Sequence, residues 1–312
     1  MLDLIKRLRL SYEVYNFFHR KQLAHNFPLY KKYGLKKKYY SSVSSKDFPG
    51  ISSEINAGTN IQKLKENKAF QDLSKEDQTS LENFENNGYA ILRNFFSADK
   101  IDEANKAIEQ LLAANEIRFK YGRKLMSVYK KSEAIKSMGQ DKRLVEILSS
   151  LISTKTILFQ SINFLQGSEQ HTHSDSIHMT TFPLGKLIAV WVALENITEE
   201  NGPLHYYPGS HKLPYYLNSD YQNEGNKWMI GDKSYEAYEK MIERKINETT
   251  FKKEVFLAKK GDVLIWHANL FHGGEPHTNK EKTRKSLVFH YFGEDAICYH
   301  EITQRPALMQ LE

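Results

Sequence analysis

Residues 170–178 read Gln-His-Thr-His-Ser-Asp-Ser-Ile-His and are the most informative stretch of the chain. His173 and Asp175 are two residues apart, so on a strand their side chains would leave the same face. An imidazole and a carboxylate placed in this way can occupy two neighbouring corners of a metal polyhedron. A distant second histidine would complete a facial triad, the arrangement that suits non-haem Fe(II) and oxygen chemistry. Alone, the His-x-Asp pair is weak evidence, because it occurs by chance in many proteins.

A second segment strengthens the prediction of a metal site. His272 lies 99 residues after His173, in the stretch that begins at Gly261-Asp262, and is a candidate third ligand. Arg284 follows twelve residues later, at the start of an expected strand. A guanidinium can pair bidentately with a carboxylate, a role that Arg fills better than Lys. Lys282 and Lys285 remain alternative cations for that role.

The sequence after residue 155 has the pattern expected of a β-rich core. Short β-branched or aromatic runs bounded by Gly, Pro or Asn predict strands over residues 88–96, 156–165, 186–194, 263–267 and 286–292. Ser74 and Ser97 are expected to cap helices, the second of which runs to about residue 115. Residues 218–252 are polar and helix-prone, and they interrupt the strands.

Taken together, these segments resemble the phytanoyl-CoA dioxygenase family of Fe(II)/2-oxoglutarate-dependent oxygenases. The motifs that carry the resemblance are Asn87-Gly-Tyr-Ala-Ile-Leu-Arg-Asn-Phe-Phe96, His173-Ser-Asp175, Trp191-Val-Ala-Leu-Glu-Asn-Ile, Asn201-Gly-Pro-Leu, Pro208-Gly-Ser-His211, Gly261-Asp262, His272-Gly and Arg284-Lys-Ser-Leu. Their order and spacing fit the family over residues 80–295, and as a set they are highly specific. Only the N-terminal segment and the 218–252 insertion lie outside the resemblance.

The resemblance implies an α+β fold with a mainly β core, a cupin-like double-stranded β-helix (jelly-roll) with helices packed on one sheet. It also implies that His173, Asp175 and His272 bind Fe(II). The family uses 2-oxoglutarate and O2 as cosubstrates, and hydroxylates an unactivated C–H bond while releasing succinate and CO2. Related halogenases lack the carboxylate that Asp175 supplies here, so its presence favours hydroxylation.

The cosubstrate site follows from the same resemblance. Arg284 is expected to hold the far carboxylate of 2-oxoglutarate, and Trp191 matches a position that lines the site. Lys124 and Gln160 are further candidates for contact with the cosubstrate. The Pro208-Gly-Ser-His211 motif is interpreted as a structural turn.

Three other histidines compete for the metal. His171 would share a strand face with His173, and His178 and His267 lie close by in the sequence. Each one alone is more typical of a polar supporting residue than of a ligand.

Composition limits the class of protein. The 312 residues are 40% hydrophobic and 26% charged, which is typical of a folded globular protein. The longest apolar run, Leu187–Leu194, has eight residues, whereas a helix needs roughly twenty to cross a bilayer. A single cysteine, Cys298, excludes an internal disulfide and a thiolate-based metal site. With no secretory signal pattern, a cytoplasmic location is expected.

The net charge of +6 is unevenly distributed. Residues 1–40 hold ten Lys and Arg against two acids, a net +8, which leaves −2 for the rest. Apolar residues at helical spacing accompany this charge, namely Leu2, Ile5, Leu8, Tyr12, Tyr15 and Phe18. Such a helix either packs this stripe on the body, the preferred interpretation, or lies peripherally on the inner face of an anionic membrane.

We therefore divide the chain into a basic amphipathic arm (1–45), a linker or covering segment (46–79) and the dioxygenase domain (80–300). The 218–252 insertion is either a lid or an ordinary helical excursion. The substrate is expected to be a small or lipid-like molecule, and the basic arm favours an anionic one. The alternative functions are a catalytically silent iron- and 2-oxoglutarate-binding sensor or scaffold of the same fold, and a nucleic-acid-binding protein that acts through the basic arm. A nucleic-acid partner is not expected, because the body offers no basic groove.

Overall fold

The computed structural model describes residues 6–48 and 58–309. The helices are α2 (Arg9–Phe18), α3 (Asn26–Lys32), α4 (Ile61–Glu66), α5 (Lys68–Gln71), α6 (Lys75–Glu82), α7 (Phe84–Asn87), α8 (Ala98–Ala113), α9 (Glu133–Gly139), α10 (Lys142–Leu151) and α11 (Tyr235–Asn247). The strands are β1 (Tyr89–Leu92), β2 (Phe119–Lys120), β3 (Lys124–Met126), β4 (Thr156–Phe164), β5 (Thr180–Phe182), β6 (Leu187–Ala193), β7 (Leu204–Tyr206), β8 (Glu254–Phe256), β9 (Val263–His267), β10 (His272–Gly274), β11 (Ser286–Gly293), β12 (Ile297–His300) and β13 (Arg305–Pro306).

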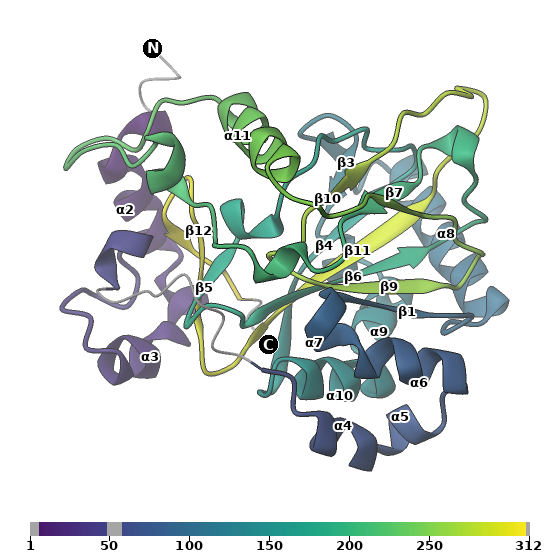
Figure 1. Cartoon of the computed structure of the whole chain (residues 1–312). Coiled ribbons are helices and arrows are strands. Elements are labelled where there is room, and N and C mark those ends of the chain that lie inside the picture. The colour runs from purple at the N-terminus through teal and green to yellow at the C-terminus, as the bar shows by residue number, and fades with distance from the viewer. Residues whose placement is uncertain (1–5, 49–57, 310–312) are drawn as a thin grey trace.

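The strands form one large sheet and two small ones. The seven-stranded sheet has the order β1-β9-β6-β11-β4-β3-β2, and the small sheets have the orders β10-β7-β8 and β13-β12-β5. The large sheet carries helices on one face, while α11 lies on the opposite side (Figure 1). This is a jelly-roll with helices on one sheet, and the expected fold class is confirmed.

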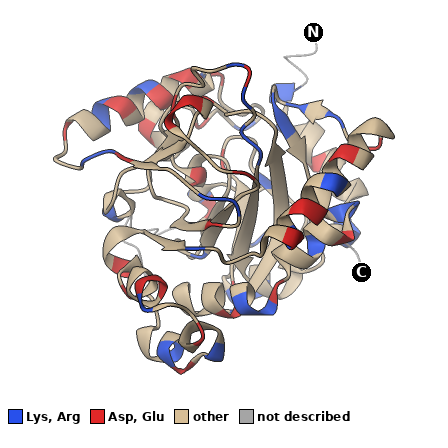
Figure 2. Cartoon of the chain, turned by 90° about the vertical axis from the view of Figure 1, so that its right-hand side faces the viewer, with Lys and Arg blue, Asp and Glu red and all other residues tan. Residues whose placement is uncertain are grey.

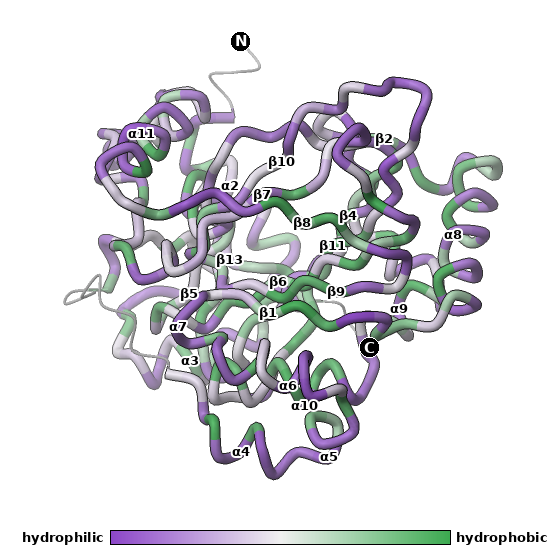
Figure 3. Tube along the Cα trace, turned by 45° about the vertical axis from the view of Figure 1, so that its right-hand side comes forward, coloured by the Kyte–Doolittle hydropathy of each residue, from purple (hydrophilic) through white to green (hydrophobic). Residues whose placement is uncertain are grey.

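Strand β6 shows why the strands of the large sheet are continuous apolar runs in the sequence. All of its residues are buried, because the sheet is covered on both faces. Alternate residues join the core beneath the helices, namely Ile188, Val190 and Val192. The residues between them face the small sheets, namely Ala189, Trp191 and Ala193. The apolar strands therefore run through the middle of the molecule (Figure 3). Every second position of β6 joins the core on the side of the small sheets.

The predicted strands include the four longest described strands, together with β1, which spans four residues of the expected 88–96. All five appear as β1, β4, β6, β9 and β11, which are members of the large sheet. The strands of the two small sheets have two to four residues each and give no pattern long enough to recognise.

The two predicted helix caps are also confirmed. The Ser97 hydroxyl accepts a hydrogen bond from the backbone N–H of Lys100 at the start of α8, and Ser74 accepts one from Asp77 at the start of α6. Within the covering segment, α4 and α5 contribute Leu64 and Phe70 to the core beneath the large sheet.

Charged residues lie on the outer helices and loops, whereas the central strands are largely free of them (Figure 2). Among the described residues, no helix is both long enough and apolar enough to cross a bilayer.

The arm folds as the expected helix, α2, and docks on the insertion. The backbone N–H of Arg9 donates to the carbonyl of Trp228 at 2.9 Å, and that of Ile230 donates to Arg7 at 2.9 Å. A β-bridge joins Leu8 to Met229. Two residues of the predicted stripe, Leu2 and Ile5, lie outside the described residues, as does 49–57 of the covering segment.

The Pro208-Gly-Ser-His211 motif is a structural turn. The Gly209 N–H donates to the carbonyl of Asn87 at 2.8 Å, and the His211 ring lies 3.1 Å from the carbonyl of Glu85. Because its φ is +78°, Gly88 adopts the left-handed conformation that ends α7. A Cβ at Gly88 would lie 2.3 Å from Nδ1 of His211. The turn therefore packs against Gly88, directly before β1, where only glycine fits.

We expect Gly88→Ala to destabilise the fold more than Gly34→Ala. Both glycines have positive φ, but a Cβ at Gly34 would meet no atom within 4 Å. The control, Gly34→Ala, should lower the free energy of unfolding by about 1 kcal/mol through backbone strain alone. Gly88→Ala should lower it by at least about 2 kcal/mol more, because its Cβ overpacks against the buried His211 ring. Denaturant unfolding of both variants measures the difference, and equal losses would contradict this assignment.

Candidate active site

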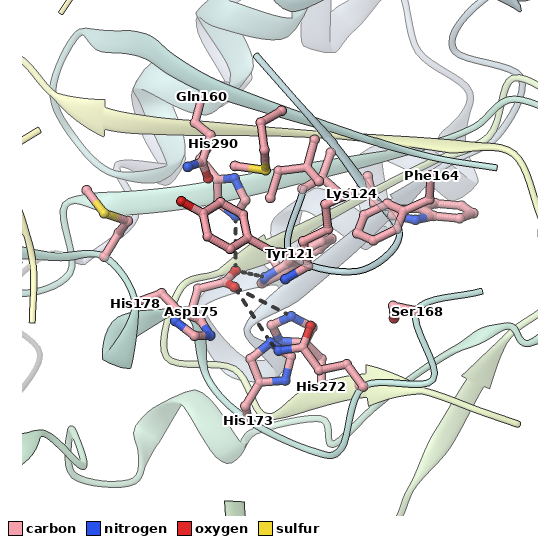
Figure 4. Close-up of a pocket in the computed structure, with 18 of the residues that line it drawn as sticks. Tyr121, Lys124, Gln160, Phe164, Ser168, His173, Asp175, His178, His272 and His290 are labelled. Atoms are coloured by element: carbon pink, nitrogen blue, oxygen red, sulfur yellow. Dashed lines mark hydrogen bonds and ion pairs between the residues drawn. The ribbon is translucent and has the colours of Figure 1, made fainter. Parts of the chain in front are cut away.

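His173 and His272 are held side by side by backbone pairing. They form an antiparallel bridge in which each N–H donates to the other's carbonyl at 2.9 Å, and their ring centroids lie 4.5 Å apart. Asp175 does not sit on a strand, contrary to the assumption made for the His-x-Asp spacing, but begins a 3-10 turn (Asp175–Ile177). The turn brings its Oδ1 to 4.0 Å from Nε2 of His173 and 3.8 Å from Nε2 of His272. The three side chains converge in Figure 4.

The tautomers of both histidines suit metal binding. Nδ1 of His173 lies 2.8 Å from the carbonyl of His171, and Nδ1 of His272 lies 3.0 Å from that of Leu270. Since a carbonyl only accepts, Nδ1 carries the proton and Nε2 presents its lone pair to the site. Burial and the neighbouring His272 hold the pKa of His173 well below its usual value, which keeps the ring neutral. The three ligand atoms lie within 4.8 Å of one another, so the residues present fit a divalent cation.

The buried Asp175 carboxylate is supported from the large sheet. Its Oδ2 accepts a hydrogen bond from Nε1 of Trp266 at 2.8 Å and lies 3.5 Å from Nε2 of His290. In the sheet register, these two residues flank Ala189, whose small side chain leaves room between them. Burial alone would raise the pKa of Asp175, but the imidazoles of His272, His290 and His173 outweigh it and hold the pKa well below the usual range.

Trp266 and His290 were missed by the sequence analysis. The alternation of β9 and β11 contains a signal for them, because each lies two residues from a position that faces the interior of the roll, namely Leu264 and Val288. The sequence does not show that both side chains lie beside Asp175.

Arg284 is a buried cation without a buried anion. Its side chain is 1% exposed; Nε donates to the carbonyl of Gly202 at 3.0 Å, and Nη1 donates to the Ser286 hydroxyl at 2.6 Å. No carboxylate of the described residues lies within ion-pair distance of it. Burial lowers the pKa of Arg284 to about 10, against the opposing effect of Glu195, so the group stays charged at neutral pH. A desolvated, unpaired guanidinium favours binding of a carboxylate.

The two alternative cations lie elsewhere. Lys282 pairs with Glu200, and Lys285 pairs with Glu109 at 2.9 Å, both on the surface. Arg284 is the member of this trio that reaches the pocket.

A pocket of about 530 Å³ joins these groups. The predicted cosubstrate residues Trp191, Gln160 and Lys124 all line it, together with Arg284 and the triad. Gln160 on β4 pairs in register with His290 on β11. Burial lowers the pKa of Lys124, partly offset by the charge of Asp175. The buried indole N–H of Trp191 lacks a hydrogen-bond partner in the described structure, which leaves a donor for a ligand.

None of the three competing histidines belongs to the triad, although the His178 ring centroid lies 6.0 Å from that of His173. His171 is exposed. His178 lines the pocket and packs against Tyr235, with ring centroids 4.7 Å apart. His267 is buried, and its Nδ1 accepts the N–H of Asn269 at 3.1 Å.

The insertion packs behind the site through α11. The Tyr235 hydroxyl lies 3.2 Å from the side-chain amide of Gln170, which in turn lies 3.2 Å from Nε2 of His173. Tyr238 lies 3.0 Å from the Ser174 hydroxyl. The insertion therefore contacts the segment that carries His173 and Asp175. Cys298 is buried away from this cluster, and burial raises the pKa of its thiol.

A jelly-roll whose interior presents two histidines, one carboxylate and a buried arginine around one pocket defines a non-haem iron, 2-oxoglutarate-dependent oxygenase. Comparison with known proteins agrees with this class. The phytanoyl-CoA dioxygenase (PhyH) family matches residues 84–286, and the chain belongs to this family. It is an Fe(II)- and 2-oxoglutarate-dependent dioxygenase.

Individual relatives have low identity. The ectoine dioxygenase of Sphingopyxis alaskensis is 27% identical over 214 residues, which cover 61% of this chain and 67% of the relative. A phytanoyl-CoA dioxygenase domain-containing protein 1 homolog of Dictyostelium discoideum is 27% identical over 217 residues, covering 67% and 70%.

Among solved structures, the carbocyclase SnoK from nogalamycin biosynthesis superposes with a TM-score of 0.59 at 17% identity, covering 73% of this chain and 87% of SnoK. The S. alaskensis EctD structure with 2-oxoglutarate and 5-hydroxyectoine gives 0.53 at 19% identity, covering 81% and 86%. These likenesses support the fold.

We predict that Trp266→Phe weakens Fe(II) binding by about 10- to 100-fold, because Asp175 loses the donor that orients it. Trp228→Phe is the matched control, since Trp228 is 71% exposed and far from the pocket lining. Anaerobic Fe(II) titration measures both, with thermal unfolding to show that the variants remain folded. Unchanged iron affinity in a folded Trp266→Phe protein would contradict the role given to this hydrogen bond.

Proposed function

We propose that the protein hydroxylates an unactivated C–H bond of a small organic substrate, consuming 2-oxoglutarate and O2 and releasing succinate and CO2. The observation that carries this proposal is the placement of two complementary sites in one pocket. His173, Asp175 and His272 would hold the iron, and Arg284 would pair with the far carboxylate of 2-oxoglutarate. Bound iron supplies the oxygen-activating chemistry.

The chain's own residues position and shield the reaction. Arg284 is rigid, because its guanidinium already donates to Gly202 and Ser286 and lies 5.5 Å from the centroid of the Trp191 ring. The carboxylate that it orients would therefore lie in a fixed direction relative to the triad. Phe164 and Trp191 form apolar walls around this cation, which strengthens the pairing by excluding water.

We also propose that the substrate is anionic or lipid-like, and that residues 1–40 hold the enzyme peripherally at a membrane. Two further cations of the pocket lining, Lys124 and Arg305, support an anionic group. Arg305 has no carboxylate of the described residues within ion-pair distance.

Fe(II)-dependent release of succinate from 2-oxoglutarate tests the reaction. We expect slow turnover without substrate and none in His173→Ala, which loses a ligand, whereas the exposed His171→Ala retains wild-type turnover. Iron titration of the same variants shows whether a variant without turnover has lost iron binding or still binds iron and has lost succinate release. The alternative, a silent iron- and 2-oxoglutarate-binding sensor, would bind both ligands and release no succinate under any condition.

Metabolite comparison of cells with and without the gene tests the hydroxylation itself. The substrate should accumulate without the enzyme, and a product heavier by one oxygen atom should disappear. A product without added oxygen would contradict hydroxylation while leaving the dioxygenase class intact.

Arg284→Gln should raise the KM for 2-oxoglutarate by about 100-fold or more, because a charge-assisted bidentate pair is lost from a dry site. Lys285→Gln is the matched control, since Lys285 pairs with Glu109 at the surface, and it should change the KM less than about twofold. The measurement is succinate release against 2-oxoglutarate concentration at saturating Fe(II). Equal effects in the two variants would contradict the assignment of Arg284.

A further inference from the structure

Helix α2 has two apolar faces, and the predicted stripe forms only the inner one. Tyr12 and Tyr15 point toward the body, where the guanidinium of Arg305 lies 5.6 and 5.4 Å from their ring centroids. Leu8 forms the bridge to the insertion. The prediction that Phe18 packs with this stripe is wrong, because its side chain is 75% exposed.

The outer face carries a second stripe that the sequence analysis did not identify. Leu10, Val14, Phe17 and Phe18 follow helical spacing and are 70%, 48%, 45% and 75% exposed. Phe27, on the neighbouring α3, is 62% exposed. Of the eleven exposed large apolar side chains in the described structure, these five belong to one short segment, residues 10–27. Single exposed apolar residues are ordinary, but this concentration marks an interaction surface.

The same N-terminal segment carries exposed basic side chains. These are Arg20, Lys21, Lys31, Lys32, Lys36 and Lys38, all of them exposed. None has a carboxylate of the described residues within ion-pair distance. Arg20 lies directly over the Phe17 ring, 4.6 Å from its centroid, so positive charge borders the apolar surface. Figure 1 shows α2 and α3 together at one edge of the molecule, away from helices α4–α10.

We propose that this outer face, defined by Leu10, Val14, Phe17, Phe18 and Phe27 with its basic border, docks on an anionic lipid bilayer. Apolar side chains entering the headgroup region and lysines facing anionic lipids are the two contributions that such binding combines. A nucleic acid would use the charge but not the exposed Leu, Val and Phe side chains. A second copy would bring like charges together.

The docked orientation has a consequence for the site, and this step rests on the proposed function. Arg305 lines the pocket and is held by the inner face of the same helix whose outer face meets the lipid. The pocket wall would then lie about 10 Å from the bilayer, one helix diameter away. This favours an amphiphilic substrate whose anionic group meets Arg305.

Sedimentation of the full chain with vesicles tests the docking. We expect binding to vesicles of phosphatidylcholine with phosphatidylglycerol, weakened by salt, and little binding to phosphatidylcholine alone. The triple variant Leu10→Ser, Phe17→Ser, Phe18→Ser should bind at least about tenfold more weakly. The matched control is Phe119→Ser, Val255→Ser, Leu257→Ser, whose side chains are 48%, 41% and 45% exposed on other elements, and it should bind as the wild type does.

Three results would overturn the docking proposal. They are equal binding of the two triple variants to anionic vesicles, binding of an oligonucleotide in place of vesicles, and a dimer in solution that the α2 triple variant dissociates. Succinate release without vesicles keeps the two proposals separable, since the α2 variant should retain it. A wild type that binds vesicles but never releases succinate would contradict the proposed function and leave the docking surface intact.

Discussion

The buried carboxylate of Asp175 is the group on which the rest of the site depends. A charge removed from water is tolerated only where donors and opposite charge surround it. Here the supporting groups come from two separate strands, Trp266 on β9 and His290 on β11. Both strands flank β6, so the sheet holds one oxygen of the carboxylate and leaves the other facing the two Nε2 atoms of His173 and His272. The contacts that stabilise the buried charge therefore leave its free oxygen in a metal-binding geometry.

Arg284 presents the opposite case, a buried charge whose hydrogen-bond partners in the described structure, Gly202 and Ser286, are neutral. Leaving such a charge unpaired is costly, and the cost is recovered when an anionic ligand arrives. In the proposed function, Asp175 would belong to a metal-binding part of the pocket and Arg284, beside Trp191 and Phe164, to a carboxylate-binding part. Since both charges lie in a dry interior, each interaction with a ligand is stronger than it would be in water.

The parts of the fold that sequence reasoning predicted are those governed by local chemistry. The long strands of the large sheet show as apolar runs because they are buried on both faces, and Ser74 and Ser97 show as caps because a hydroxyl satisfies an N–H within three residues. The strands of the small sheets are too short to leave a pattern, and exist because partner strands from distant parts of the chain supply the hydrogen bonds. Only tertiary pairing therefore distinguishes them from loops.

The same division applies to the site and to the arm. The sequence by itself determined the residue types and order of the triad and of Arg284, since these chemistries tolerate few substitutes and recur in recognisable motifs. Tertiary structure decided that Trp266 and His290 reach Asp175, that Tyr235 of the insertion reaches Gln170, and that Arg284 rather than Lys282 or Lys285 enters the pocket. It also decided which face of α2 meets the body, because both faces are apolar and periodicity alone does not distinguish them. Burial and long-range contact are properties of the whole chain, and no window of sequence contains them.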